Sequence, residues 1–474
     1  MSTAIVWFRR DLRLADNPAL HAAVSAGHRV LPVYVHAPDE EAPWTPGAAS
    51  AWWLHHSLQA LDQQLRQRGS RLLICRGSSE QCLTQLIEAS GAQALYWNRL
   101  YDPALTARDR VLKEGLRARG LEVRSYAGHL LAEPFELRTG AGEPYRVFTP
   151  FWRNLSGRVQ AQTPLPAPAR LDAPDIADAL TVAQLGLLPT LPWDQGFYPE
   201  WTPGEAGALA ALEVFIAQAL DGYASGRDRP DQRGTSRLSP ALHFGEISPR
   251  QIVHRLWGDA SPGRRALAEP YLRELGWRDF GHHLLYHFPH TVHEPLQPGF
   301  AAFPWAEPVP ERLAAWQRGR TGIPIVDAGM RELWSTGWMH NRVRMIVASL
   351  LTKNLRYHWL HGARWFWDTL VDADLANNTQ GWQWSAGSGA DAAPYFRIFN
   401  PIAQGERFDP DGRYVRRFVP ELAKLSGAAV HQPWTIGGVR GYPKPIVDLK
   451  SSREAALAAY AQMRGKSVDA AMPG

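Results

Sequence analysis

Polar and aromatic side chains that could bind a ligand gather in one stretch, "DADLANNTQGWQWSAGSGADAAPYFRIFNP", from Asp372 to Pro401. Carboxylates such as Asp372 and Asp374 could accept hydrogen bonds from a ribose or a heterocycle, although an Asp pair alone is usually a cap or turn. Large aromatics are usually buried or used for binding. We therefore interpret the stretch as a glycine-punctuated loop that binds a planar polar ligand.

A second group lies in "DGYASGRDRPDQRGTSRLSPALHFGEIS", residues 221–248. Thr235, Ser236 and Ser239 offer hydroxyls and unpaired N–H groups near an expected helix start, and Arg237 stands beside them. This combination suits a phosphate or pyrophosphate. Plain N-capping by the same hydroxyls is the alternative.

A third group lies in "YLRELGWRDFGHHLL", where Glu274, Trp277 and Arg278 occur at i, i+3 and i+4 and so share one helix face. A carboxylate, an indole and a guanidinium suit stacking and hydrogen bonding to a base. A core Trp flanked by an exposed ion pair is the alternative. His283 and His287 have metal-compatible spacing, but no HExxH motif or Cys/His pairing accompanies them, so we expect no metal site.

The helical period of "IVDAGMRELWSTGWMHNRVRMIVASLLTKNLRYHW" predicts one long helix. Along that helix Trp338, Arg342 and Met345 would line one face, with Asn341 and Arg344 beside it. Because an indole and a thioether gain nothing from water, a cleft wall explains this face better than a solvated surface.

The elements that position these groups divide the chain into two folds. Residues 1–130 alternate expected strands (4–8, 29–35, 71–75, 94–97 and 121–126) with helical stretches, as in an α/β doubly wound parallel sheet. Such sheets bind ligands beyond the carboxyl ends of their strands. Residues 131–204 are rich in Pro and turn formers and read as an inter-domain linker, and residues 205–474 as an all-α domain.

The composition agrees with two folded domains. The chain has 474 residues, 45% of them apolar and 20% charged, and no window approaches a membrane span. The N-terminus lacks the pattern of a signal peptide, and only Cys75 and Cys82 occur, so we expect a cytoplasmic protein. A net charge of +5 points weakly to nucleic acid, because the arginine excess could reflect base composition. The 20 tryptophans suit packing and leave a redox role open.

Several long blocks carry a family resemblance that runs nearly end to end. They include "VWFRRDLRLADNPAL" (6–20), "GTSRLSPALHFGEISPR" (234–250), "AWQRGRTGIPIVDAGMREL" (315–333) and the stretch from Asp372 to Pro401. The sequence resembles the photolyase/cryptochrome family, and within it the microbial cyclobutane pyrimidine dimer photolyases, most of all those of class I, or their close plant-cryptochrome-like relatives. The resemblance implies an antenna-binding α/β domain and a helical domain that holds FAD, active as FADH⁻.

The resemblance also implies a cofactor site. The flavin diphosphate and its surroundings would be bound by Tyr223, Thr235, Ser236, Arg237, Leu238 and Ser239. The flavin would be lined by Arg278, Asn341 and Arg344, and its polar edges would be held by Asp372 and Asp374. Tyr271 would belong to the same site. Many relatives have Trp where this chain has Tyr271. Asn378 matches the position that faces flavin N5, and Trp382, Trp359 and Trp305 match the hopping chain that photoreduces oxidised flavin.

The implied substrate is UV-damaged DNA. A flipped dimer would lie against Glu274, Trp277, Asn341, Met345 and Trp384, and Arg227, Arg342 and Arg397 would contact phosphates. Glu274, if protonated, would stabilise the dimer radical anion by a hydrogen bond. Light absorbed by FADH⁻ would drive an electron to the dimer and back, which makes the enzyme a lyase without net redox change.

A cryptochrome photoreceptor is the main alternative. Three features argue against a cryptochrome. Asn378 stands where plant-type cryptochromes have Asp, the residues expected to line the base pocket (Glu274, Trp277 and Trp384) are present, and a long C-terminal tail is lacking. A (6–4) photolyase is disfavoured because the pocket sequence here is "WMHNR", whereas that group has a different, histidine-bearing sequence at this place. For the antenna chromophore we favour methenyltetrahydrofolate over a deazaflavin, since residues 96–110 resemble the plant-cryptochrome side. We expect a monomer.

Overall fold

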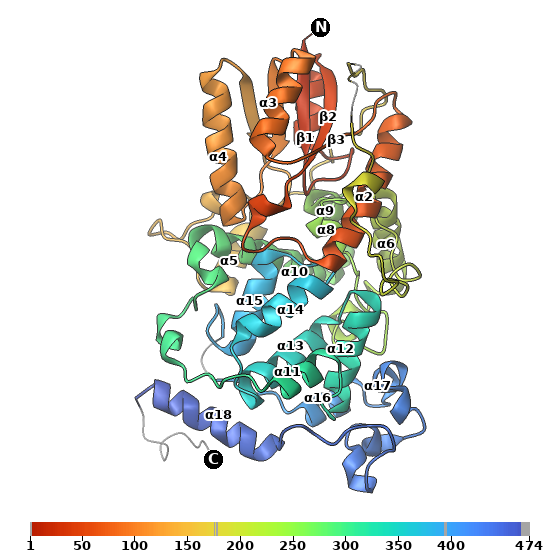
Figure 1. Cartoon of the computed structure of the whole chain (residues 1–474), viewed down its shortest axis with the longest axis vertical. Coiled ribbons are helices and arrows are strands. Elements are labelled where there is room, and N and C mark those ends of the chain that lie inside the picture. Colours follow the sequence, from red (N-terminus) through yellow and green to blue (C-terminus); the bar gives the residue numbers. More distant parts are fainter. Residues whose placement is uncertain (1, 175, 177–178, 393–395, 466–474) are drawn as a thin grey trace.

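The N-terminal part of the protein is a parallel sheet covered by helices on both faces (Figure 1). The computed structural model describes residues 2–174, 176, 179–392 and 396–465. The strands run in the order β3-β2-β1-β4-β5, all parallel. Their bounds are β1 (Thr3–Phe8), β2 (Arg29–His36), β3 (Leu73–Arg76), β4 (Ala94–Asn98) and β5 (Glu122–Tyr126), and the helices between them are α1 (Pro18–Ser25), α2 (Ala48–Arg66), α3 (Ser79–Ser90) and α4 (Pro103–Ala118).

Alternating side chains of β1 enter two separate hydrophobic cores, as the two-residue period of a strand requires. Val6 and Phe8 join the core that also contains α1 and α2, whereas Ile5 and Trp7 join the core with α3 and α4. Because both faces are covered, the strands read as continuous apolar runs in the sequence. The predicted doubly wound sheet is confirmed, with each strand within two residues of its expected limits.

The C-terminal part is helical, as predicted, and its elements surround two further large cores. Figure 1 shows it below the sheet, with α18 across the far end. The bounds are α5 (Phe148–Ser156), α6 (Glu205–Gln218), α7 (Tyr223–Gly226), α8 (Ser239–His243), α9 (Pro249–Trp257), α10 (Pro262–His287), α11 (Pro310–Gln317), α12 (Pro324–Thr336), α13 (Asn341–Ser349), a π-helical turn η6 (Leu350–Asn354), α14 (Trp359–Thr369), α15 (Leu375–Ala386), α16 (Pro401–Phe408), α17 (Arg413–Phe418) and α18 (Leu449–Met463).

Two expectations about local structure are wrong. The long helix expected through "STGWMHNRV" is broken, because Gly337 ends α12 in a left-handed conformation (φ 69°) and His340 caps a new helix, α13. Trp338 therefore lies between helices and not on a face shared with Arg342. The stretch after Asp372 is also not a loop, since Asp374 caps α15, which carries Asn378, Trp382 and Trp384.

Within residues 131–204, α5 packs against α10 through Phe148, Phe151 and Trp152, which join the core of the helical part. Among the residues that the structure describes, no helix is long and apolar enough to cross a membrane.

A buried arginine from the segment after β1 joins the sheet to the helical part. Arg13 is fully buried (0% exposed) and donates to the carbonyl oxygens of Gly245 (2.8 Å), Gly128 (2.8 Å) and Asp16 (2.8 Å). Nearby, the Glu205 carboxylate accepts from the backbone N–H groups of Leu14 and Ala15. Buried charges are costly unless they are fully hydrogen-bonded, so these contacts fix how the two parts meet.

Glu246 is a fully buried carboxyl at the same junction. Because of it, we expect the free energy of unfolding of the protein to depend on pH. Its Oε1 accepts from Trp53 Nε1 (3.0 Å) and Gly204 N (2.6 Å), and burial raises its pKa to about 7 from an ordinary value of 4.5. Because the folded state holds this proton more tightly, the stabilisation is fully present below pH 4.5 and is lost as the pH rises through 7. A shift of this size corresponds to roughly 3 kcal/mol.

The test is the free energy of unfolding of the wild type minus that of Glu246→Gln, measured by denaturant titration between pH 4.5 and 8. We expect this difference to fall as the pH rises, since glutamine does not titrate. A difference that stays flat or increases would contradict the raised pKa of Glu246.

Candidate functional site

Asp372 is the centre of a charged contact between three elements. Its carboxylate accepts two hydrogen bonds from Arg344 Nη2 on α13 (2.8 and 3.0 Å) and one from Ser239 Oγ on α8 (2.6 Å). Trp338 Nε1 lies 3.4 Å from the same hydroxyl. Ser239 is exposed although its partner Asp372 is buried. The contact between Asp372, Arg344, Trp338 and Ser239 therefore reaches the protein surface at Ser239.

The loop before α8 can offer an anion its backbone N–H groups and hydroxyls, but not the Arg237 side chain. Arg237 adopts a left-handed conformation (φ 54°), and its guanidinium pairs with Glu200 (2.7 Å) and lies over the Trp201 ring (4.2 Å). The Arg237 side chain is thus engaged by the linker, which leaves the backbone N–H groups and hydroxyls of Thr235 and Ser236 as the donors that this loop can offer an anion.

Two buried tyrosines, Tyr271 and Tyr223, pack together beside this loop. Tyr271 donates its hydroxyl to Ser236 Oγ (3.0 Å) and packs edge to face with Tyr223 (5.4 Å between ring centres). Both are buried, as is Leu238. The structure therefore brings Tyr223, Tyr271 and the loop together, as the family resemblance implies.

Asp374 has a different set of partners from Asp372. Its Oδ1 accepts from the backbone N–H (2.9 Å) and the side chain (2.6 Å) of Asn377, and its Oδ2 lies 3.3 Å from His243 Nδ1 and 3.4 Å from His282 Nε2. Burial alone would raise the pKa of Asp374, but the two imidazoles outweigh it and hold the pKa well below the usual range. Asp374 anchors the first turn of α15.

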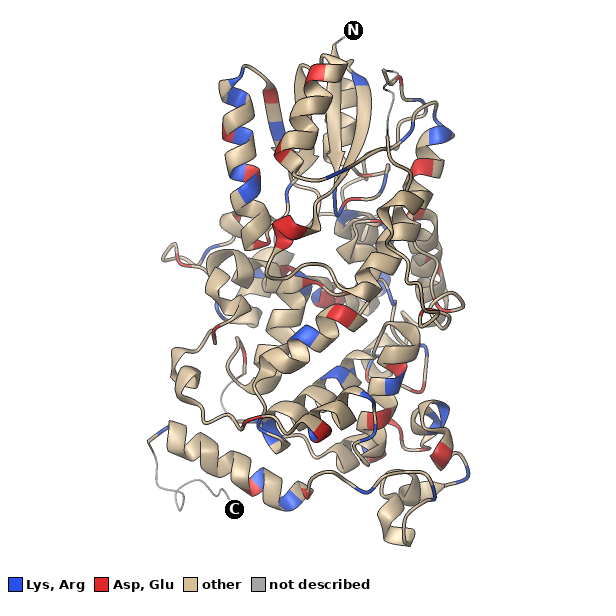
Figure 2. Cartoon of the chain, viewed as in Figure 1, with Lys and Arg blue, Asp and Glu red and all other residues tan. Residues whose placement is uncertain are grey.

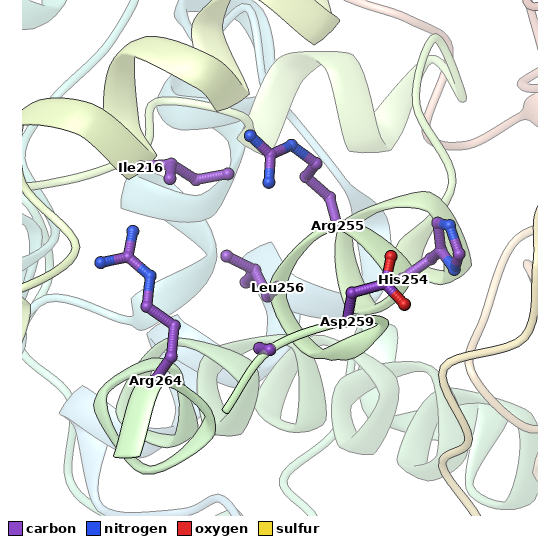
Figure 3. Close-up of a pocket in the computed structure, with 7 residues that line it drawn as sticks. Ile216, His254, Arg255, Leu256, Asp259 and Arg264 are labelled. Atoms are coloured by element: carbon purple, nitrogen blue, oxygen red, sulfur yellow. The ribbon is translucent and has the colours of Figure 1, made fainter. Parts of the chain in front are cut away.

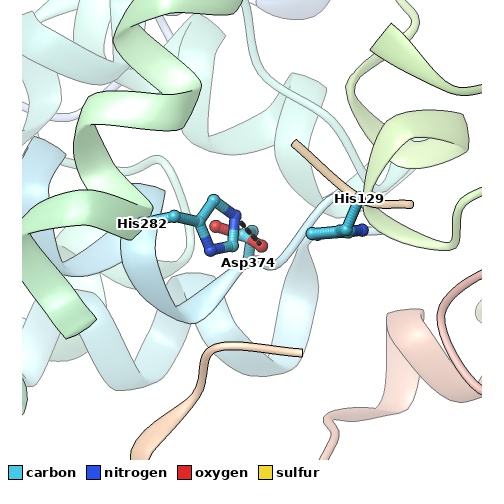
Figure 4. A group of neighbouring side chains, drawn as sticks. All are labelled: His129, His282 and Asp374. Atoms are coloured by element: carbon cyan, nitrogen blue, oxygen red, sulfur yellow. Dashed lines mark ion pairs between the residues drawn. The ribbon is translucent and has the colours of Figure 1, made fainter. Parts of the chain in front are cut away.

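His129, His282 and Asp374 converge closely enough to be compared with a metal site (Figure 4). The Arg278 guanidinium, however, donates to His129 Nε2 (2.8 Å) and to the His129 carbonyl oxygen (2.8 Å). A cation is therefore already present beside the cluster, and we assign no metal to it. His283 and His287 face the Pro134 carbonyl oxygen (3.2 and 3.0 Å), so their helical spacing serves backbone contacts.

Asn378 is fixed by one end of its amide only. Its Nδ2 donates to the carbonyl oxygen of Ala363 on α14 (2.9 Å). Among the described residues its Oδ1 has no hydrogen-bond donor. The side chain can therefore present a neutral acceptor to a ligand, and the bond to Ala363 decides which end is presented.

Trp382, four residues further along α15, is buried against α14. Its ring lies 5.0 Å from Phe366 and 6.1 Å from Trp316, and Gly362 leaves room for it, since a Cβ there would lie 1.9 Å from the indole. Trp359 is the first residue of α14, and His358 lies between Trp359 (5.6 Å) and the partly buried Trp305 (5.1 Å). The aromatic side chains thus form two groups, Trp382 with Phe366 and Trp316, and Trp359 with His358 and Trp305, that pack in or against one hydrophobic core.

On α10, Glu274 and Trp277 face a different set of partners. Glu274 forms an ion pair with Arg227, and both side chains are about one third exposed. Burial raises the pKa of Glu274 although Arg227 opposes this shift. Trp277 stacks on Phe148 at 3.7 Å with an angle of 9° between the rings. One face of this indole is thereby fixed by α5, which holds the ring in a single orientation.

The remaining predicted DNA contacts lie on neighbouring elements. The Arg397 guanidinium lies over Trp384 (5.7 Å), which stacks on Phe399 (6.4 Å). Arg342 pairs with Asp228 (2.8 Å) and lies over Phe408. Asn341 and Arg397 are exposed and Met345 is partly buried. Arg227 and Arg342 are therefore engaged by carboxylates in the free protein, which the sequence did not predict.

Charged residues fill the carboxyl edge of the sheet near β1 and β4. The strand order reverses between these two strands, and a ligand of a doubly wound sheet would bind there. Arg9 pairs with Asp109 (2.6 Å), and Arg10 pairs with Asp102 (2.5 Å) and Glu41. Figure 2 shows the acidic turn η1 (Pro38–Glu41) beside the mixed charges of α4. These residues include part of the stretch 96–110 on which the antenna expectation rests.

A surface cavity of about 280 Å³ lies elsewhere, between α6, α9 and the start of α10 (Figure 3). Its two arginines are already paired, Arg255 with Glu213 (2.6 Å) and Arg264 with Asp221 (3.0 Å). None of the predicted site residues lines this cavity, so we assign it no part in the function.

Comparisons with known proteins agree with this arrangement. Residues 4–169 match the family model "DNA photolyase", and residues 271–462 match "FAD binding domain of DNA photolyase". The chain is 50% identical to a deoxyribodipyrimidine photo-lyase of Agrobacterium fabrum, over 97% of this chain and 98% of the relative. It is 40% identical to cryptochrome-2 of Arabidopsis thaliana, over 97% of this chain and 79% of the relative.

The fold agrees equally well with a solved structure. A bacterial class III photolyase from Agrobacterium tumefaciens superposes with a TM-score of 0.93 at 49% identity, and 98% of each chain is covered. The protein belongs to the photolyase/cryptochrome family, and its helical part is a FAD-binding domain. The similar structure from Agrobacterium tumefaciens is a class III photolyase, whereas the sequence favours class I.

The side chains present fit a flavin. A neutral acceptor (Asn378 Oδ1), an Arg344–Asp372 pair beside the exposed Ser239 hydroxyl, and a loop rich in N–H donors supply the polar contacts that a heterocycle and a diphosphate need. Asp374 differs, because its Oδ1 already accepts two hydrogen bonds from Asn377 and its Oδ2 one from His243. Its partners His243 and His282 escaped the sequence analysis, since lone histidines carry no distinctive spacing.

Proposed function

We propose that the protein repairs cyclobutane pyrimidine dimers in DNA in a light-dependent reaction, as a deoxyribodipyrimidine photolyase with FAD as its cofactor. The observation that carries the proposal is Asn378, whose amide is held by Ala363 so that its neutral oxygen is presented. A neutral acceptor adds no negative charge beside an anionic reduced flavin. The identity to a relative named deoxyribodipyrimidine photo-lyase supports the same reaction.

When bound, the reduced flavin would supply the light-excited electron donor. The chain's own residues would hold it through Arg344, Asp372 and the loop before α8. Arg278 would contribute by holding the segment after β5 at His129 against α10. Trp277 and Trp384 would stack on the damaged bases, which stacking on aromatic rings favours by about 1–3 kcal/mol per base.

The Glu274–Arg227 ion pair suggests how the pocket responds to DNA. A phosphate that draws Arg227 away would leave Glu274 in a half-buried site without its counter-ion, and burial already raises its pKa. Protonation would then turn Glu274 from an acceptor into a hydrogen-bond donor for the dimer. Arg227 and Glu274 thus work as one unit in this proposal.

A direct assay tests the proposed function. A duplex that contains one thymine dimer is mixed with protein whose flavin has been chemically reduced, and the dimer is counted after blue-light exposure and after an equal time in the dark. We expect loss of dimers in the light only, and no loss of (6–4) photoproducts. Dimers that persist in the light, with flavin bound and reduced, would contradict the proposal.

Replacing Glu274 separates its hydrogen-bonding role from simple packing. Glu274→Gln keeps an N–H donor and should retain most of the repair rate of the reduced enzyme, whereas Glu274→Ala should lose about ten-fold, since a hydrogen bond to a charged group contributes about 1.5–3 kcal/mol. The repair rate per absorbed photon is the measurement, at DNA concentrations that saturate each variant. Equal rates in the two variants would refute the donor role.

A cryptochrome-type photoreceptor is the second candidate, because the chain is 40% identical to a plant cryptochrome. The dimer assay distinguishes the two, since a photoreceptor without repair activity would reduce its flavin in light but leave dimers intact. Salt dependence adds a second criterion, because Arg397 and the other basic residues would bind phosphates and affinity for DNA would fall as salt rises.

The antenna chromophore remains a prediction of methenyltetrahydrofolate over deazaflavin. The polar edge of the sheet, with Arg9, Arg10 and their acidic partners, is the place where such a pigment would be sought. The absorption spectrum of freshly purified protein distinguishes the two pigments.

A further inference from the structure

Lys353 is a buried lysine that the proposed reaction does not use. It lies in the π-helical turn η6 that follows α13, and its side chain is 1% exposed. Burial lowers the pKa of its ammonium well below the usual range, and no ion pair to it occurs within the described ranges. Burying a lysine without a carboxylate is costly, so the contacts that it makes must be important for something other than charge pairing.

The first contact of Lys353 is with the end of α15. Its Nζ donates to the carbonyl oxygen of Ala386, the last residue of that helix (2.7 Å). A cation at this point satisfies one of the carbonyls that a helix end leaves open and interacts favourably with the helix dipole. Trp384 lies two residues earlier, so this contact holds the turn that carries it.

The second contact is with the segment that carries Arg397. The Lys353 ammonium lies 3.1 Å from the centre of the Phe396 ring, a cation–π contact, and the other side of this ring is stacked on Tyr460 of α18 (4.5 Å, 8°). Phe396 directly precedes Arg397. Lys353 thus touches both chain segments that meet at Trp384 and Arg397.

Ser349, four residues before Lys353, holds the same segment further along. Its Oγ accepts from the backbone N–H of Phe399 (3.1 Å). A π turn inserts an extra residue into a helix and is frequent at functional sites. Lys353, Trp384, Arg397 and Phe399 border one small cavity, which confirms that the contacts support a single wall.

We propose that Lys353 is a positioning residue that fixes Trp384 and Arg397 relative to each other and thereby sets the preference of the protein for damaged DNA. The inference rests on the proposed function, because Trp384 and Arg397 belong to its DNA-binding surface. Lys353 acts through these two residues and does not itself contact the substrate.

The test uses the full-length protein with flavin bound and the variant Lys353→Met, which keeps an unbranched side chain and removes the ammonium. Lys450→Met, an exposed lysine of α18, is the matched control. We expect Lys353→Met to bind dimer-containing duplex about ten-fold more weakly, the effect of losing a hydrogen bond from a charged group, and undamaged duplex almost as well as wild type. The maximal repair rate at saturating DNA and the flavin content should stay unchanged.

Two results would overturn the proposal. One is an unchanged ratio of affinities for damaged and undamaged duplex. The other is a parallel loss of flavin, thermal stability and both affinities, which would show a purely structural role. Ser349→Ala, which removes only the contact to Phe399, should reduce the same ratio to a smaller extent, and an unchanged ratio would count against the proposal.

Amide hydrogen exchange of Phe396–Phe399 tests the positioning without any DNA. We expect exchange to be about ten-fold faster in Lys353→Met than in the wild type and the Lys450→Met control, because local opening becomes easier when a supporting contact is lost. Unchanged exchange would refute the positioning role. Faster exchange in a protein whose wild type shows no preference for dimers would refute the proposed function and leave the contact itself established.

Discussion

The variant Trp382→Phe is expected to lose light-driven reduction of its oxidised flavin down to the level of a dark control, while the chemically reduced variant still repairs dimers. Phenylalanine is much harder to oxidise than tryptophan, so a path that begins at Trp382 would be interrupted at its first step. Trp382 is well suited to this step because it is buried on α15, the helix that presents Asn378. The measurement is flavin absorbance under continuous blue light with an external reductant.

Trp316→Phe is the matched control for this experiment. Trp316 is equally buried, lies 6.1 Å from Trp382 and donates to the Val347 carbonyl oxygen (3.0 Å), but it does not belong to the predicted path. It should lose comparable packing energy and keep photoreduction. Unimpaired photoreduction in Trp382→Phe, or equal loss in both variants, would eliminate the assigned path.

Asn378→Asp is expected to disfavour the anionic reduced flavin at least ten-fold relative to the oxidised form. Two like charges about 4 Å apart repel by roughly 4 kcal/mol at an effective dielectric near 20, and each 1.4 kcal/mol is a factor of ten. An aspartate also cannot donate to the Ala363 carbonyl oxygen unless it is protonated, which leaves that carbonyl without its partner. The midpoint potential of the bound flavin, followed against pH, is the measurement.

The pH dependence makes this result specific. At low pH the new carboxyl would be neutral and could restore the bond to Ala363, so the potential should approach that of the wild type. Asn378→Ala, which removes the amide without adding charge, should change the potential much less at every pH. A potential that is the same in Asn378→Asp and wild type at high pH would contradict the placement of Asn378 beside the flavin.

Some features of the fold were predictable because local physics decides them. The strands of the sheet are apolar runs bounded by turns, and residues such as Val6 and Ile5 alternate between two cores, which leaves little choice of structure. The helical period of α10 placed Glu274 and Trp277 on one helix for the same reason. The break at Gly337 does not follow from the sequence, because a single glycine inside a helical period can either be tolerated or end the helix.

The candidate site was only partly predictable, since its partners are far apart in sequence. The residue types at Asp372 and Asp374 look equivalent, yet tertiary contacts give them different tasks: one pairs with Arg344, and the other accepts from Asn377 and lies beside two histidines. The polar and small residues of the stretch predict a loop, whereas Asp374 caps a helix there. Lys353 escaped notice because a lone lysine among apolar residues suggests solvent exposure.

The buried hydrogen bonds of Arg13 bear on how the proposed DNA substrate would bind. Its three carbonyl contacts tie the segment after β1 to Gly128, which follows β5, and to Gly245 in the helical part, and Arg13 itself is fully buried. A clamshell motion of the two parts would have to break this bond network and leave a charge stranded. If the protein binds damaged DNA as proposed, the two parts would keep their relative position, and the deformation needed for docking would fall on the duplex. Selectivity would then depend on how easily each site in DNA can be bent and unpaired.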